Sequence, residues 1–400
     1  MVYKLSFKDI KFFEKKDKIR AFFLKMYYFD ILKSDLLKIS NFRIENQNIL
    51  FEIDNIKKFE KKINELINEG FNNLVNNLTQ KKTIYIHSNS NIPLLGSQYF
   101  GIVDRNTNLI EIRPNTSCNL NCIYCSIDEG VSSKKNVDFV VEKEYIVGEL
   151  KKLVKLKQDD DIEIHINPQG EPLLYSPLID LINDISKIKQ VKRISMDTNG
   201  TMLTKKMVDD LINSGLTQFN ISIDSMDEKI AEKIADTKYN VDKIINICKY
   251  ISKKTNLILA PLFIKGINDL EIEKIILFSK KINAKIGIQN FLNYKHGRNP
   301  TKSISMDDFY LKLKSLEEKY LVKLIYKQKD FLIHETKKLD NPFRKDEIVN
   351  LELLFPLQLK NEYLSVLKNR AISVISNKNK KKIKARIIRT KHNIIKAISF

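Results

Sequence analysis

The chain has 400 residues, of which 43% are hydrophobic and 30% are charged. This balance excludes an intrinsically disordered chain, and the length suffices for two or three domains with cores of their own. The net charge of +20 favours a polyanionic partner. We expect no signal peptide and no membrane span, because the longest apolar stretch, Leu257–Ile264, is far too short to cross a bilayer.

Residues 1–90 mix the patterns of helix and strand, and we expect them to form an N-terminal α+β accessory region. A helix is predicted over Ile56–Leu78, because Phe59, Ile63 and Ile67 recur at the spacing of one helical face. No combination of residues in this region is typical of catalysis. Its expected role is therefore packing against the rest of the chain.

Residues 91–300 alternate between predicted strands and helices. The helices expected there are Glu142–Lys155, Pro177–Ile188, Lys205–Ser214, Asp227–Ala235, Val241–Lys253 and Leu270–Lys281, and the strands are Gln98–Val103, Leu109–Arg113, Ile162–Asn167, Arg193–Asp197, Phe219–Asp224, Leu257–Phe263 and Lys285–Phe291. Repeated βα units indicate a parallel sheet, and six strands, counted from Leu109–Arg113, favour a partial (β/α)₆ barrel. In such α/β folds the functional site lies at the carboxyl ends of the strands.

Residues 301–340 are predicted to form a helical connector that is mostly helical to about Tyr326. Beyond Asn341-Pro342 the pattern changes to short β-like runs, which indicate a small all-β domain over residues 341–400. These runs are Glu347–Leu354, Tyr363–Leu367, Ala371–Ile375, Ile383–Ile388 and Ile394–Ile398. Residues 341–400 contain 14 lysines and arginines against 4 aspartates and glutamates, so they carry half of the excess positive charge.

The segment Lys378–His392 alternates charged residues with β-branched ones. Such alternation predicts a strand with one cationic face, and a small β-barrel with that face can follow a phosphate backbone. The alternative is a charged sheet face that contacts only solvent. No aromatic signature of RNA recognition is present, so shape and charge would govern RNA binding.

Three of the four cysteines, Cys118, Cys122 and Cys125, follow the first barrel strand with the spacing C-x₃-C-x₂-C. Three thiolates at this spacing can hold three irons of a [4Fe–4S] cluster and leave the fourth iron open. Structural zinc is the alternative, but zinc sites usually pair two such elements and no second pair occurs. Clustered free thiols favour a reducing, cytoplasmic location. Cys248, on the apolar face of a predicted helix, is expected to be a core thiol.

With Tyr124 before the last cysteine, this loop resembles the signature of the radical S-adenosylmethionine (SAM) superfamily. The resemblance implies that the three cysteines hold a [4Fe–4S] cluster and that SAM chelates its open iron. It also implies that one electron, from a flavodoxin- or ferredoxin-like donor, cleaves SAM to methionine and a 5′-deoxyadenosyl radical. This radical would then abstract a hydrogen atom from the substrate.

Other segments match superfamily motifs. Gly170-Glu171 follows the second strand, where the superfamily has a Gly-Gly-Glu motif that helps to hold the SAM ammonium group, although Gln169 replaces the first glycine. Ser222 and Asp224 match positions that contact the ribose or the carboxylate of SAM. The cofactor-binding residues implied by the resemblance are Tyr124, Gly170, Glu171, Asn199, Ser222 and Asp224.

Two predicted strands carry polar residues on the face opposite their apolar side chains. Glu163, His165 and Asn167 share one face of the second strand, and Asn220 lies on the corresponding face of the fourth. Strands wrapped by helices are normally apolar on both faces, so these polar faces predict a polar cavity inside the barrel. The candidates for substrate contact are His165, Gln289, His296 and Arg298.

From about Ile92 to Phe400 the chain resembles an archaeal family of uncharacterised radical SAM proteins with a C-terminal β-rich extension. The extension resembles the TRAM-type, OB-like modules of RNA-modifying radical SAM enzymes. The resemblance therefore implies modification of an RNA, with tRNA as the first candidate. One alternative is radical chemistry on a small molecule, lipid or peptide, with the basic domain as a lid or oligomer contact. Another is a cluster-bearing RNA-binding protein without turnover.

Overall fold

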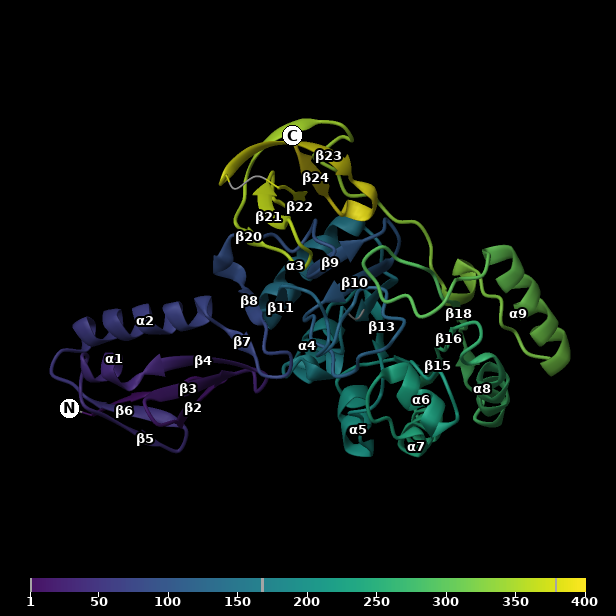
Figure 1. The fold of residues 1–400 in the computed structure, drawn as a ribbon, viewed down its shortest axis with the longest axis horizontal. Coiled ribbons are helices and arrows are strands. Elements are labelled where there is room, and N and C mark those ends of the chain that lie inside the picture. Colours follow the sequence, from purple (N-terminus) through teal and green to yellow (C-terminus); the bar gives the residue numbers. More distant parts are fainter. Residues whose placement is uncertain (1, 167–168, 378–379) are drawn as a thin grey trace.

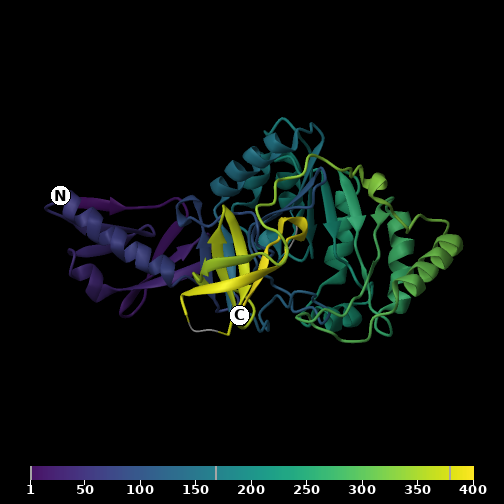
Figure 2. The same ribbon diagram turned by 90° about the horizontal axis from the view of Figure 1, so that it is seen from above.

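A computed structural model describes residues 2–166, 169–377 and 380–400, so Asn167, Lys378 and Asn379 lie outside the described residues. The N-terminal part lies to one side of a central α/β barrel, and the C-terminal strands lie above it (Figure 1). Seen from above, the C-terminal strands cover the part of the barrel nearest the N-terminal region (Figure 2).

The N-terminal part combines two sheets with one long helix. Its elements are β1 (Val2–Leu5), β2 (Ile10–Glu14), β3 (Lys18–Phe23), β4 (Tyr27–Leu32), α1 (Lys33–Leu37), β5 (Phe42–Glu45), β6 (Asn48–Glu52), α2 (Ile56–Asn72), β7 (Val75–Asn76), β8 (Lys82–Ile86) and the 3₁₀ turn η1 (Ser88–Ser90). One sheet has the order β1-β6-β5, and the other runs β11-β8-β7-β4-β3-β2, where β11 is Val137–Val141. Because β8 pairs in parallel with β11, this sheet crosses the predicted boundary at residue 90, and the domain division stays a prediction.

Helix α2 begins at the predicted residue but ends earlier than predicted. The side chain of Asn55 caps it by accepting a hydrogen bond from the amide of Lys58 at 3.0 Å. Its buried residues Phe59, Ile63 and Ile67 form the predicted apolar face. The prediction of a helix to Leu78 is wrong, because the chain after Asn72 turns into β7, which pairs with β4 and β8.

The central sheet forms a partial barrel with the order β17-β15-β14-β13-β12-β10-β9. Its strands are β9 (Gly101–Asp104), β10 (Leu109–Arg113), β12 (Ile162–Ile166), β13 (Val191–Thr198), β14 (Gln218–Ile221), β15 (Asn256–Leu259) and β17 (Lys285–Ile286), and its helices are α3 (Lys143–Lys157), α4 (Leu178–Ser186), α5 (Lys205–Asn213), α6 (Glu228–Ala235), α7 (Val241–Ile251) and α8 (Asp269–Lys281). All of the strands except β9 run parallel, which confirms the predicted partial (β/α)₆ barrel.

The last two barrel strands are interrupted near their carboxyl ends. Pro261 has no amide hydrogen to donate, and it separates β15 from the short strand β16 (Leu262–Phe263). β16 pairs in parallel with β18 (Gln289–Asn290), which continues beyond β17. The fourth strand also ends early: β14 stops at Ile221, so Ser222 and Asp224 lie in the loop at its carboxyl end.

The connector after the barrel contains less helix than predicted. α9 (Met306–Tyr320) is followed by extended chain and the 3₁₀ turn η3 (Gln328–Phe331). The helix ends because the amides of Leu324 and Ile325 donate to the carboxylate of Glu317, at 2.6 and 2.9 Å, in place of helical carbonyls. The prediction of helix to Tyr326 is therefore wrong.

The C-terminal part is a single mixed sheet, which confirms the predicted small all-β domain. Its strands, in the spatial order β19-β23-β24-β22-β21-β20, are β19 (Ile348–Glu352), β23 (Lys382–Arg389), β24 (Lys396–Ser399), β22 (Arg370–Ile375), β21 (Glu362–Leu367) and β20 (Phe355–Pro356). β22 and β24 run parallel and the other pairs are antiparallel. The TRAM-like or OB-like character of this domain stays a prediction.

Backbone contacts attach the C-terminal sheet to the body. The amide of Ala371 donates to Leu95 O and the amide of Ile395 donates to Gly96 O, both at 2.9 Å. A side chain at Gly96 would collide with the backbone, because its Cβ would lie 2.1 Å from Ala371 O. The C-terminal sheet is therefore packed directly on the segment that precedes the barrel.

Among residues 2–166, 169–377 and 380–400, no helix is both long enough and apolar enough to cross a membrane.

Candidate cofactor and substrate site

The three clustered cysteines lie in the loop after β10, at the carboxyl ends of the barrel strands. They line a cavity of about 360 Å³. The loops after β12, β13 and β14 supply other walls of the cavity. Every cofactor-binding residue implied by the sequence lines it: Tyr124, Gly170, Glu171, Asn199, Ser222 and Asp224. The structure therefore brings together residues that are spread over about a hundred positions of the chain.

The N-terminal region supports the start of the cysteine loop. Asn76 donates from its amide to the Ser117 hydroxyl at 2.6 Å and to the Asp138 carboxylate at 2.7 Å. The Tyr27 hydroxyl lies 3.4 Å from the same serine oxygen. Since Ser117 immediately precedes Cys118, these buried contacts fix the backbone from which the first thiol projects. The accessory region thus has a defined contact with the site.

Arg298 supports the other end of the cysteine loop. Its guanidinium donates to the carbonyls of Asn121 and Cys122, to the carbonyl of Glu129 at 2.9 Å, and to the Asp128 carboxylate at 2.7 Å. Its donors are therefore directed at the loop, and it lines neither of the two large cavities. The prediction that Arg298 contacts substrate is corrected: in the structure it holds the loop, because the chain after β18 folds back over residues 121–129.

The surroundings of Cys118 and Cys122 disfavour free thiolates. Burial raises the pKa of Cys122 to about 12 and that of Cys118 well above its usual value, so thiolates at these positions need a nearby positive charge such as iron. The amide of Glu129 donates to Cys125 Sγ at 3.2 Å, as a bond to a cluster-bound sulfur would. Among the described residues no three His, Cys, Asp or Glu side chains form a site for a single metal ion. A cluster requires no such group, because each thiolate binds a different iron.

Gly170 lies very close to the backbone at the start of the cysteine loop. A Cβ at this position would lie 2.2 Å from Ser117 O and 2.5 Å from Thr116 O. Only glycine fits there without moving the backbone that carries Cys118.

Gly170→Ala is expected to displace the cysteine loop and to destabilise the protein by about 1–3 kcal/mol, the usual cost of overpacking. The iron content after cluster reconstitution, measured by colorimetric iron analysis, should fall. Gly148→Ala is the matched control, because a Cβ at Gly148, within α3, would meet nothing within 4 Å. Equal iron contents in the two variants would contradict the proposed constraint.

Glu171 fixes the end of the neighbouring strand. Its carboxylate accepts hydrogen bonds from the Thr198 hydroxyl at 2.6 Å and from the amides of Asn199 and Leu173 at 2.9 and 3.1 Å. Burial raises the pKa of Glu171 to about 7, and these donors oppose the rise. Asn199 in turn donates from its side-chain amide to Asn119 at 3.0 Å. Glu171 therefore holds Asn199 against the cysteine loop.

Asp224 and Tyr124 form the opposite wall of the cavity. The Tyr124 hydroxyl donates to one oxygen of the Asp224 carboxylate at 2.6 Å, and the amide of Leu262 donates to the other at 2.8 Å. Burial raises the pKa of Asp224 to about 6, against the effect of these two bonds. Tyr124, the aromatic residue of the cysteine motif, is thus hydrogen-bonded directly to the loop after β14.

A second, larger cavity of about 830 Å³ occupies the interior of the barrel. The polar side chains that line it from the strands are Glu111, Glu163, His165, Arg193, Ser195, Asp197, Gln218, Asn220, Asn256, Lys285 and Gln289. Phe309 of α9 and residues 324–333 form another wall. Asp197, Ala260 and Gln289 line both cavities, so the two meet at the carboxyl end of β13.

His165 lies in a chain of hydrogen bonds across the inner face of the barrel. Its Nδ1 is 2.8 Å from the Ser195 hydroxyl, which donates to Glu163 at 2.6 Å, and its Nε2 is 3.3 Å from the Asp197 carboxylate. Burial lowers the pKa of His165, but Asp197, Glu163 and Glu111 raise it, and the net direction is upward. The predicted polar cavity is present, although Asn167 lies outside the described residues.

The remaining substrate candidates are placed differently. Gln289, on β18, lines both cavities, so it stays a candidate. His296 is exposed and lines neither of them. His296 is therefore not placed to contact a substrate inside the barrel.

Comparison with known proteins identifies the family of the chain. Residues 112–279 match the radical SAM superfamily. Over 354 residues the chain is 38% identical to the uncharacterised protein MJ0103 of Methanocaldococcus jannaschii, a match that covers 80% of this chain and 81% of the relative. The chain belongs to the radical SAM superfamily. It is a radical SAM enzyme, and the superfamily uses a [4Fe–4S] cluster and SAM.

Other known proteins match this chain over a smaller part of its length or with lower sequence identity. The chain is 34% identical to a GTP 3′,8-cyclase of Thermodesulfovibrio yellowstonii over 194 residues, which cover 47% of this chain and 58% of that relative. Streptococcus suis SuiB bound to S-adenosylmethionine matches with 14% identity over 79% of this chain and 69% of its own, at a TM-score of 0.41. TYW1 with a lysine-pyruvate adduct bound matches with 19% identity over 60% of this chain and 82% of its own, at a TM-score of 0.42.

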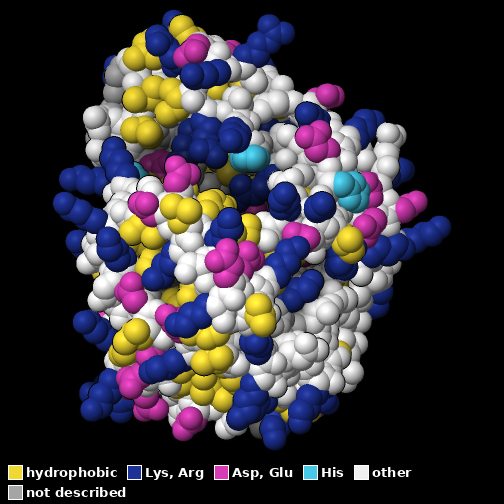
Figure 3. Space-filling model, turned by 90° about the vertical axis from the view of Figure 1, so that its right-hand side faces the viewer, with side chains coloured by type: hydrophobic (Ala, Val, Ile, Leu, Met, Phe, Trp, Pro, Cys, Tyr) yellow, Lys and Arg dark blue, Asp and Glu magenta, His cyan; other side chains and the backbone are white. Residues whose placement is uncertain are grey.

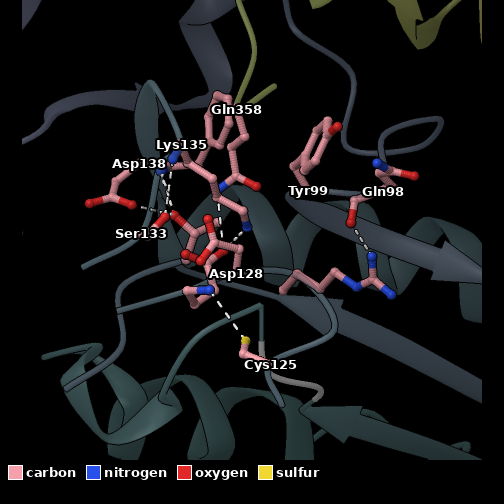
Figure 4. Close-up of polar contacts among 12 residues, drawn as sticks. Gln98, Tyr99, Cys125, Asp128, Ser133, Lys135, Asp138 and Gln358 are labelled. Carbon is pink, nitrogen blue, oxygen red and sulfur yellow. Dashed lines mark hydrogen bonds and ion pairs between the residues drawn. The ribbon is translucent and has the colours of Figure 1, made fainter. Parts of the chain in front are cut away.

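This radical SAM enzyme has a buried polar junction beside its cysteine loop that the sequence did not indicate. The Glu129 carboxylate, which lines the cofactor cavity, is paired with Lys135 and accepts a hydrogen bond from Gln358 at 3.2 Å. Burial raises the pKa of Glu129 to about 8, and Lys135 opposes the rise. Figure 4 shows Lys135 and Gln358 converging on the segment that follows Cys125. The C-terminal domain therefore contacts the cysteine loop through Gln358.

Proposed function

We propose that this radical SAM enzyme modifies an RNA, with tRNA as the first candidate, and that residues 341–400 bind it. The supporting observation is the burial pattern of β23. Lys382, Lys384 and Arg386 are exposed on one face, while the side chains between them are buried on the other. A row of cations at every second residue of a strand suits contact with successive phosphates.

We infer that Cys118, Cys122 and Cys125 hold the [4Fe–4S] cluster. When bound, the cluster supplies the electron that cleaves SAM to methionine and a 5′-deoxyadenosyl radical. An electron donor such as a flavodoxin or ferredoxin would act in the reducing cytoplasm. The cluster site fits this role, because the three half-buried thiols line one cavity and Cys125 already accepts a backbone hydrogen bond.

The side chains around the cysteines would bind and orient SAM. Gly170 lets the chain after β12 lie directly against the start of the cysteine loop, and Glu171 positions Asn199. Ser222 and Asp224 offer oxygens on the opposite wall, where Tyr124 fixes the Asp224 carboxylate. The apolar lining excludes water from a reactive radical; it consists of Leu120, Ala231, Ile234, Leu262 and Phe291.

A nucleotide is the second candidate substrate. The larger cavity, of about 830 Å³, is bounded by α9 and residues 324–333 of the same chain, so it can enclose a small molecule. The similarity to GTP 3′,8-cyclases over 47% of the chain agrees with a nucleotide. A nucleoside flipped out of an RNA would occupy the same cavity, because it has the same base and ribose as a free nucleotide.

The RNA proposal is tested on the tRNA of cells with and without the gene. Mass spectrometry of the nucleosides is expected to show one modification that is missing without the gene and restored by the wild-type protein. Purified protein is expected to bind tRNA with an affinity that falls with salt. The triple variant Lys382→Gln, Lys384→Gln, Arg386→Gln should reduce the salt slope by roughly 3 if each side chain contacts one phosphate.

An unchanged nucleoside profile, together with no salt-sensitive binding of tRNA, would reject the RNA proposal. The nucleotide proposal is then tested by incubating the reconstituted enzyme with SAM, dithionite and GTP. Conversion of GTP with a matching yield of 5′-deoxyadenosine is the result expected for that substrate.

A further inference from the structure

We propose that phosphate groups of the substrate bind a cationic cluster that adjoins the larger cavity through Glu111. This rim cluster consists of Arg105, Arg389, Lys391 and His392. The inference deepens the proposed function and rests on it in one respect, since it takes the carrier of the phosphates to be the substrate. The rim cluster is distinct from the row of cations on the exposed face of β23.

The rim cluster forms where the C-terminal domain meets the barrel. The short 3₁₀ turn η4 (Lys391–Asn393) lies on β9, where the Asn393 amide is 3.3 Å from both the carbonyl and the carboxylate of Asp104. Arg105 directly follows Asp104, so this contact brings it beside Lys391 and His392. Figure 3 shows a hollow beneath the C-terminal strands, where lysine and arginine side chains gather next to a histidine.

A salt bridge connects the rim cluster to the barrel interior. Arg105 Nε lies 2.5 Å from a carboxylate oxygen of Glu111, which lines the larger cavity. Glu111 is also the register partner of His165 on the neighbouring strand. The Arg105 side chain is 40% exposed and the Glu111 side chain 6%, so the guanidinium projects from the cavity wall towards solvent.

The rim cluster has more positive charge than nearby carboxylates can neutralise. Within the described part of the chain, Arg389 and Lys391 form no ion pair. The strand register places Arg389 opposite Lys396, and like charges in that arrangement repel each other. Burial lowers the pKa of His392, and Arg105, Lys391 and Arg389 lower it further. An anion bound here would relieve this repulsion.

A phosphate group has the chemistry that such a cluster recognises. Guanidinium groups bind phosphate oxygens through paired hydrogen bonds, and a lysine adds a point charge. The larger cavity extends from Glu111 to Asp197 and Gln289. Asp197 and Gln289 also line the cofactor cavity. A nucleotide with its phosphates on the rim cluster would therefore place its sugar and base in the barrel, facing the cysteine side.

The test measures binding of inorganic tripolyphosphate to the full-length, cluster-reconstituted protein by isothermal titration calorimetry. Arg389→Gln with Lys391→Gln is expected to weaken binding about ten- to hundred-fold, since hydrogen bonds to charged groups are lost. Both residues are exposed, so the fold should persist, which circular dichroism verifies. Lys57→Gln with Lys61→Gln is the matched control: it removes two exposed cations of α2, in the N-terminal part, and should leave binding within about two-fold, as an exposed substitution does.

Two further ligands distinguish the source of the phosphate. If a mononucleotide is the substrate, GTP should bind at least as tightly as tripolyphosphate and depend equally on Arg389 and Lys391. If RNA is the substrate, a single-stranded oligonucleotide should bind more tightly than GTP and lose affinity both in Arg389→Gln with Lys391→Gln and in Lys382→Gln with Lys384→Gln, which changes the exposed face of β23. Either pattern supports the rim cluster as a phosphate site.

Absence of tripolyphosphate binding would overturn the inference. Equal weakening of tripolyphosphate binding by Arg389→Gln with Lys391→Gln and by Lys57→Gln with Lys61→Gln would also overturn it, because binding would then reflect total charge and not a site. These outcomes do not depend on SAM cleavage or on the tRNA profile. An unchanged tRNA profile with rim-dependent tripolyphosphate binding would reject RNA as substrate and leave the phosphate site standing.

Discussion

Cys122→Ala is expected to abolish reductive cleavage of SAM. The variant loses one of three thiolates that line the cofactor cavity, and two cysteines leave a second iron without a protein ligand. Production of 5′-deoxyadenosine with dithionite, measured by liquid chromatography and mass spectrometry, should fall to the level of iron-free protein. The visible absorbance of the reconstituted cluster should fall with it.

Cys248→Ala is the matched control for this substitution. Cys248 is fully buried in α7, where burial raises the pKa of its thiol to about 12, as expected of a core residue. Its replacement should leave both the iron content and the yield of 5′-deoxyadenosine near wild type. A wild-type yield from Cys122→Ala would contradict the cluster assignment, and so would an equal loss from Cys248→Ala.

Lys157→Met is expected to destabilise the protein by about 3–5 kcal/mol, the cost of leaving a buried charge without its partner. The ammonium group of Lys157, at the end of α3, lies 2.8 Å from the Asp104 carboxylate, and both side chains are 0% exposed. Methionine fills a similar volume but cannot neutralise the aspartate. The free energy of unfolding is measured from urea denaturation curves.

Two comparisons isolate the effect of the buried charge. Lys155→Met makes the same substitution at an exposed site in the same helix, and it should change the free energy of unfolding by less than about 0.5 kcal/mol. Adding Asp104→Asn to Lys157→Met removes the unpaired charge and should restore part of the loss. A Lys157→Met variant as stable as Lys155→Met would show that the pair contributes nothing.

Much of the barrel was predictable because its signals are local. Alternating βα patterns predicted the parallel strands, and β10 (Leu109–Arg113) agrees with its predicted bounds. The cysteine spacing, with Gly170-Glu171 at the next strand end, predicted residues that the structure places around one cavity. Strand alternation predicted the polar interior around His165. Each of these signals lies within a few residues of sequence.

The contacts that the sequence did not reveal join distant segments. Arg298 was predicted to contact substrate. The sequence does not show whether the side chain of an arginine after the last strand points into the site or towards a neighbouring loop. The hydrogen bonds from its guanidinium to residues 121–129 depend on how the chain folds back after β18. Likewise, nothing near Glu129 indicates that Gln358, 229 positions later, donates to it. The early end of α9 depends on the Glu317 side chain, which competes with helical carbonyls for two amides.

The attachment of the C-terminal sheet has a consequence for synthesis of the protein. The contact between Asp104 and Asn393 joins residues 289 positions apart. At a translation rate of about 5–20 residues per second, Asn393 is synthesised roughly 15–60 seconds after Asp104. β24 lies between β23 and β22, so the C-terminal sheet cannot close until residues 396–399 have been made. We expect nascent chains to expose the surface around Gly96 during this interval, and chaperones that bind apolar segments to find it there.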